Sequence, residues 1–128
     1  MRAIQTIMAI TLLCGCASTH NLATDGNNPF GGGYLQSKVH DGIFQISVKT
    51  NWAPWVNASA ARSSWRDRAK ELCGSEKFRE LDIREANYDE RPPFVAGLRY
   101  IVTTRDGFAV CESTNLSDDA ALELIRKR

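Results

Sequence analysis

A short apolar run at the start of the chain ends in two closely spaced cysteines, and it determines how many residues are left to fold. Met1 and Arg2 precede this run, which covers residues 3–13. A positive charge followed by an apolar stretch too short to span a bilayer is typical of a secretory signal. No second apolar run of spanning length follows in the sequence. We therefore expect an exported protein without a transmembrane helix.

The end of the run, Leu13-Cys14-Gly15-Cys16, resembles the lipobox of bacterial lipoproteins. In that family a small residue precedes the modified cysteine and an aliphatic residue lies three positions before it, which fits Cys16. Cys14 does not fit, because Leu13 would take the place of the small residue. The resemblance implies a signal peptide over residues 1–15. It also implies a lipid-modified Cys16 as the new N-terminus, held in the membrane by several acyl chains.

The residue after the modified position bears on which membrane would hold the anchor. It is Ala17 rather than an aspartate, which by analogy with enterobacterial sorting implies the periplasmic face of the outer membrane. The alternative is ordinary signal cleavage after Ala17, which would leave the chain without a lipid. The membrane is thus the first partner that the resemblance implies.

The composition of the chain is that of one small globular domain. Of its 128 residues, 43% are hydrophobic and 24% are charged, an ordinary balance. Loss of Arg2 reduces the 16 basic residues to 15, against 15 acidic ones, so overall charge does not favour nucleic acid as a partner. Residues 17–33 are polar and indicate a flexible tether with a reach of about 20–25 Å. We therefore assign residues 16–33 to a lipidated N-terminus with its tether and residues 34–128 to the domain.

The first part of the domain has the pattern of a β-hairpin followed by a helix. Residues 34–50 form the hairpin, with Asp41-Gly42 as its two-residue turn. Pairing across that turn predicts one shared apolar face made of Leu35, Val39, Phe44, Ile46 and Val48. Residues 58–73 have the apolar spacing of an amphipathic helix. Asn57 can cap its start, and Gly74 can end it.

The sequence pattern of the second part of the domain predicts three more strands and a final helix. Residues 77–87 indicate a strand with Leu81 and Ile83 on one face, and with a bulge or late start near Phe78. Residues 88–94 contain two prolines and are expected to form a loop. Residues 97–113 predict a second hairpin around Asp106-Gly107, whose shared face comprises Leu98, Tyr100, Val102, Ala109 and Cys111. A helix capped by Ser117 follows, so the order β-β-α-β-β-β-α predicts an α+β fold, a mostly antiparallel sheet with helix packed on one face.

Two cysteines remain in the domain once the N-terminal pair is set aside. Cys73 ends the predicted helix, and Cys111 points to the sheet face that this helix would cover. A disulfide between them would close a loop of about 38 residues and stabilise the fold by about 3–4 kcal/mol. A redox or metal role is the alternative, but the pair lacks a C-x-x-C spacing and neighbouring histidines. We therefore expect a structural disulfide, formed in an oxidising compartment.

The sequence contains no pattern that indicates catalysis. His20 and His40 lie apart, and the motifs of hydrolases, metalloproteases and phosphate-binding loops are absent from the sequence,. We therefore expect no enzymatic activity, no catalytic residue, no metal site and no cofactor. Residues 31–33, a run of three glycines, are expected to be the flexible end of the tether. The basic positions of the first helix could touch anionic lipid or remain solvated: Arg62, Arg66, Arg68 and Lys70.

Two tryptophans flank a proline in the segment before the first helix. Trp52 and Trp55 lie on either side of Pro54, and exposed aromatic side chains at a rigid turn are good anchors for a sugar or a protein. The alternative is that they cover the core, or that Val56 packs on the helix as a staple. Trp52 and Trp55 are thus the candidate binding residues of the sequence.

The domain also resembles small proteobacterial lipoproteins of unknown function that carry a Gly-Gly-Tyr segment near the start. The matching stretches are residues 32–34, 44–48 and 68–72; that family's usual Gly-Asn and Thr before the helix are replaced by Thr50-Asn51-Trp52. The resemblance implies location and fold, and no activity. We expect a non-enzymatic, lipid-anchored envelope protein with an interaction, structural or stress role. The alternative is a module that binds an envelope glycan or lipopolysaccharide through its tryptophans.

Overall fold

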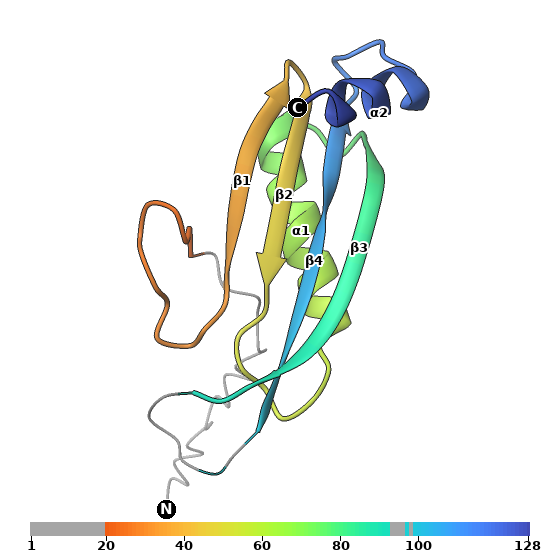
Figure 1. Cartoon of the computed structure of the whole chain (residues 1–128). Coiled ribbons are helices and arrows are strands. Elements are labelled where there is room, and N and C mark those ends of the chain that lie inside the picture. The colour runs from red at the N-terminus through yellow and green to blue at the C-terminus, as the bar shows by residue number, and fades with distance from the viewer. Residues whose placement is uncertain (1–19, 93–96, 98) are drawn as a thin grey trace, which may run out of the picture.

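A computed structural model of the chain describes residues 20–92, 97 and 99–128. The predicted signal peptide and Cys16 lie outside the described residues, as do residues 17–19, 93–96 and 98. The elements follow in the order β1 (Gly33–His40), β2 (Ile43–Lys49), α1 (Ala58–Cys73), β3 (Phe78–Glu90), β4 (Tyr100–Cys111) and α2 (Asp118–Arg126). The strands form one antiparallel sheet in the order β1-β2-β4-β3 with α1 along one face (Figure 1). The predicted α+β fold class is confirmed.

The hairpin of β1 and β2 has the predicted turn but a different register beyond it. His40 lies opposite Ile43 as predicted, and a bulge then leaves Val39 without a direct partner. From there the pairing moves by one residue, so that Tyr34 rather than Leu35 lies opposite Val48. Since a shift of one residue reverses the face, Tyr34 is 9% exposed in the core whereas Leu35 is 45% exposed,. The prediction that Leu35 and Val39 share one face of the sheet with Phe44, Ile46 and Val48 is therefore wrong.

The predicted second hairpin is also wrong, because Tyr100–Cys111 is one continuous strand. β4 lies in the middle of the sheet and pairs with β2 on one side and with β3 on the other. Gly107 lies opposite Ile46, and a side chain at this position would collide with Ile83 of β3. This glycine therefore serves close packing inside a strand. The described residues form four strands where five were predicted, and Val102 and Ala109 face opposite sides of the sheet,.

β3 is longer than predicted and carries its irregularity at another place. It runs to Glu90, so the first residues of the predicted loop belong to the strand. The register shift lies between Leu81 and Arg84, where Asp82 has a φ of 48°. This bulge sends Leu81 to the cluster beside α2 and Ile83 to the cluster beneath α1,. The predicted shared face of these two residues is therefore wrong.

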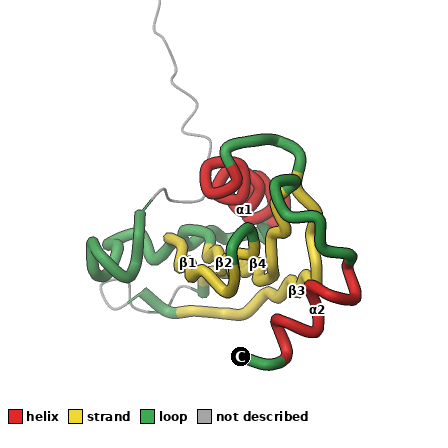
Figure 2. Tube along the Cα trace, turned by 90° about the horizontal axis from the view of Figure 1, so that it is seen from above, coloured by secondary structure: helices red, strands yellow, loops and turns green. Residues whose placement is uncertain are grey.

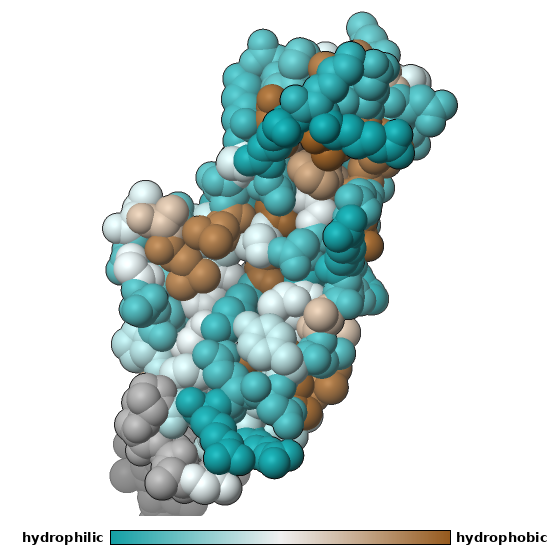
Figure 3. Space-filling model, viewed as in Figure 1, coloured by the Kyte–Doolittle hydropathy of each residue, from teal (hydrophilic) through white to brown (hydrophobic). Residues whose placement is uncertain are grey.

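The two helices cover different faces of the sheet. α1 begins at the predicted cap Asn57, ends before left-handed Gly74, and buries Ala61, Trp65 and Ala69. These side chains meet the main core cluster, whose buried sheet members are Tyr34, Ile46, Val48 and Ala109. α2 begins at the predicted cap Ser117 and packs on the opposite face near one end of the sheet (Figure 2). The remainder of that face is mostly hydrophilic (Figure 3).

The predicted disulfide joins the end of α1 to the end of β4. Cys73 and Cys111 are bonded, with their Cα atoms 5.2 Å apart and a sequence separation of 38. Cys111 is 2% exposed. The bond therefore fixes the C-terminal end of α1 to the central strand of the sheet.

Candidate binding surface at the tryptophan loop

Residues 20–33, predicted as part of a flexible tether, form contacts with the edge of the sheet. Asn21 and Tyr34 form a parallel bridge. The amide of Leu22 donates to the Tyr34 carbonyl at 3.0 Å, and the Tyr34 amide donates to the His20 carbonyl at 2.9 Å. The Asn21 side chain accepts from the Ala23 amide at 3.0 Å, which closes a local turn,. The predicted tether is thus corrected over residues 20–33, which belong to the folded domain.

The glycine run at the end of this segment lies against the tryptophan loop. A Cβ added to Gly31, whose φ is +86°, would lie 2.6 Å from the Trp52 ring. The Trp52 amide donates to the Phe30 carbonyl at 3.0 Å. The Asn51 side chain accepts from the Gly32 amide at 3.1 Å. Gly31 and Gly32 are therefore required by close packing against residues 51 and 52, whereas a Cβ at Gly33 would meet His20 and Leu22, so the run is not a flexible spacer,.

The tryptophan loop between β2 and α1 is held on both sides of its tip. Ala53 exchanges two backbone hydrogen bonds with Ile101, at 3.3 and 2.7 Å. The Asn57 amide donates to the Thr103 hydroxyl at 3.0 Å. Residues 54–56 lie between these attachments and are exposed. The loop is thus fixed at both ends and presents its middle to solvent.

The structure separates the two candidate tryptophans. Trp52 is partly buried beside Gly31, whereas Trp55 is 59% exposed. Val56 is 51% exposed. Phe30, from the neighbouring segment, is 70% exposed and was not among the predicted residues. We call Phe30, Trp55 and Val56 the apolar tip.

The apolar tip lies at the end of the sheet where β1 begins and β2 finishes. The first described residue, His20, is at this end because its carbonyl bonds to Tyr34. α2 and the C-terminus lie at the other end (Figure 1). Figure 1 shows that the segment of residues 20–33 lies beside β1, and that β3 and β4 extend past β1 and β2 at this end.

A charged network between α1 and the sheet was missed by sequence reasoning. Arg105 on β4 is 5% exposed and pairs with Glu80, at 2.9 Å, and with Glu85. Arg66 and Arg62 of α1 extend the network to the same carboxylates, at 3.0 and 3.5 Å. Every cation here has a carboxylate partner, so we assign the network to structure. The burial of Arg105 could not be predicted from the strand pattern, because arginine side chains are usually exposed.

The basic positions of α1 are balanced by acidic side chains. Arg68 pairs with Glu71 at 2.7 Å and stacks 4.0 Å from the Tyr34 ring centre. Lys70 pairs with Glu76, and this hydrogen bond lowers the pKa of Glu76 and raises that of Lys70. Like Arg62 and Arg66, these groups are partnered. The α1 face is therefore not a free cationic surface for anionic lipid.

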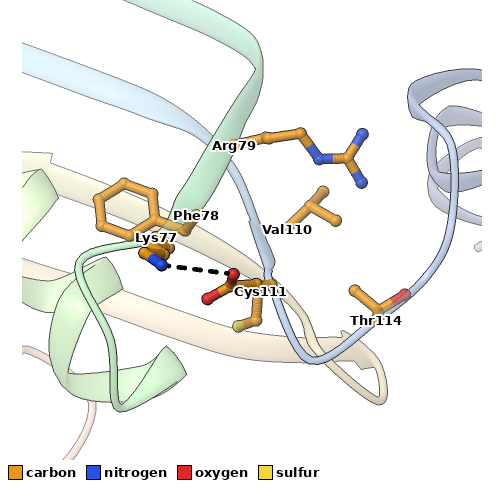
Figure 4. A pocket seen from close by; sticks show the side chains of 7 residues that line it. Lys77, Phe78, Arg79, Val110, Cys111 and Thr114 are labelled. Atoms are coloured by element: carbon orange, nitrogen blue, oxygen red, sulfur yellow. Dashed lines mark ion pairs between the residues drawn. The ribbon is translucent and has the colours of Figure 1, made fainter.

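A shallow depression of about 300 Å³ lies beside the disulfide. It is lined by the residue before β3, the start of β3, the end of β4 and the following loop: Lys77, Phe78, Arg79, Val110, Cys111, Glu112 and Thr114 (Figure 4). Lys77 lies 3.9 Å from Glu112, and Arg79 pairs with Asp118 of α2. Both cations are thus engaged within the protein, and the depression lacks the converging polar groups of a ligand site.

The described residues hold no group of three or more His, Cys, Asp or Glu side chains arranged for a metal ion. In the same part of the chain, neither helix is long and apolar enough to cross a membrane. Comparison with known proteins finds no matching family model, no matching curated protein and no matching solved structure. Among the described residues, the exposed Phe30, Trp55 and Val56 are the candidate binding residues.

Proposed function

We propose that this chain is a lipid-anchored protein of the bacterial cell envelope that acts by binding and not by catalysis. Lipidation of Cys16 holds it at the periplasmic face of the outer membrane. The proposal is supported by the resemblance of Leu13-Cys14-Gly15-Cys16 to a lipobox. The disulfide between Cys73 and Cys111 is consistent with an oxidising compartment,.

The observation that carries a binding role is the exposed Trp55. It extends from a loop that is hydrogen bonded on both sides, so its side chain can be buried against a partner without first ordering the backbone,. Aromatic side chains are frequent at the centres of protein interfaces. The function proposed for the folded domain is therefore to hold another envelope component near the membrane.

The anchor is tested with two matched cysteine variants, Cys16→Ser and Cys14→Ser. After expression with a labelled fatty acid, wild type and Cys14→Ser should carry the label and fractionate with the membrane. Cys16→Ser should lose the label, because its hydroxyl does not form the thioether. Labelling of Cys16→Ser at the wild-type level would refute the anchor.

A second candidate function is the binding of a glycan or lipopolysaccharide through Trp55. Its support is the exposed indole, since aromatic rings stack on the apolar faces of sugars. Titration with envelope glycan should then change the tryptophan emission of wild type but not that of Trp55→Phe. Trp52 is the matched position, because Trp52→Phe leaves the exposed indole in place. No emission change in wild type would count against this function.

A further inference from the structure

We draw no further inference here: the strongest candidate, the outer edge of β1 beside the 45% exposed side chain of Leu35, carries none, because nothing in the described part of the chain shows what would pair with this edge or cover that side chain.

Discussion

The guanidinium of Arg105 lies 5.5 Å from the centre of the Trp65 ring, and both side chains are enclosed between α1 and the sheet. Trp65 in turn donates its indole N–H to the Ile46 carbonyl at 3.0 Å. A cation over an aromatic face adds to the ion pairs that Arg105 makes. The centre of the α1 interface thus combines the largest buried aromatic side chain with the most buried arginine.

Removal of Arg105 should be much more costly than removal of its exposed neighbour. Arg105→Ala leaves Glu80 and Glu85 without their buried partner and should lower the free energy of unfolding by about 3 kcal/mol. Arg62→Ala, whose side chain is 55% exposed, should cost less than about 1 kcal/mol. Urea unfolding of both variants measures the difference. Equal costs would show that Arg105 is not electrostatically important.

Loss of the disulfide should destabilise the domain without changing its fold. The Cys73→Ser, Cys111→Ser double variant removes the constraint on the 38-position loop. In the chain-entropy view this costs about 3–4 kcal/mol, since the unfolded chain gains freedom. Denaturant unfolding measures the cost, and alkylation of the wild type without reductant should modify neither Cys73 nor Cys111. Two alkylated thiols would contradict the bond.

Gly31→Ala should detach residues 20–33 from the domain, whereas Gly26→Ala should not. Both glycines have positive φ, +86° and +74°, so alanine strains either by about 1–2 kcal/mol,. Only Gly31 also lies against Trp52, while a Cβ at Gly26 meets nothing within 4 Å. Hydrogen exchange at the Leu22 and Tyr34 amides should therefore accelerate much more in Gly31→Ala. Equal acceleration would mean that the Trp52 contact does not hold the segment.

The pair of Lys70 and Glu76 should contribute to stability only between acid and alkaline limits. Its hydrogen bond lowers the pKa of Glu76 below 4.5, so the contribution is present above that pH and is lost as pH falls through the folded pKa,. The pKa of Lys70 is raised above 10.5, so the contribution is lost again as pH rises through its folded pKa. Melting curves of wild type and Glu76→Gln should differ at neutral pH and converge in acid. A difference that persists well below pH 4.5 would contradict the pair.

The sequence predicted the features that depend on local signals. The turn at Asp41-Gly42, the caps Asn57 and Ser117, and the left-handed Gly74 were all correct, because each signal acts over a few residues. The disulfide was correct because α1 had a definite end and Cys111 had a definite face. Turn, cap and periodicity signals, each of which acts over a few residues, were therefore enough to predict the fold class.

The errors arose where long-range packing decides between local alternatives. Asp106-Gly107 has the composition of a turn, yet β4 continues through it because strands on both sides complete its hydrogen bonds. The bulges at Val39 and Asp82 reverse the faces of Leu35 and Ile83, and no local pattern marks either one. The glycine run was interpreted as a flexible spacer because nothing in the sequence shows that Trp52 lies against it. The exposure of Phe30 could not be predicted for the same reason.

The attachment of residues 20–33 has a mechanical consequence for the proposed lipid anchor at Cys16. A pulling force applied to the N-terminal side of His20 would reach the hydrogen bonds between His20, Leu22 and Tyr34 before it reaches the sheet. Their opening would release residues 20–33, an extended length of roughly 45–50 Å, while the loop closed by Cys73 and Cys111 stays intact. The domain thus has a short reach with this segment docked and a long reach with it released. Force spectroscopy on the anchored chain should show this extension as a first step, ahead of unfolding of the sheet.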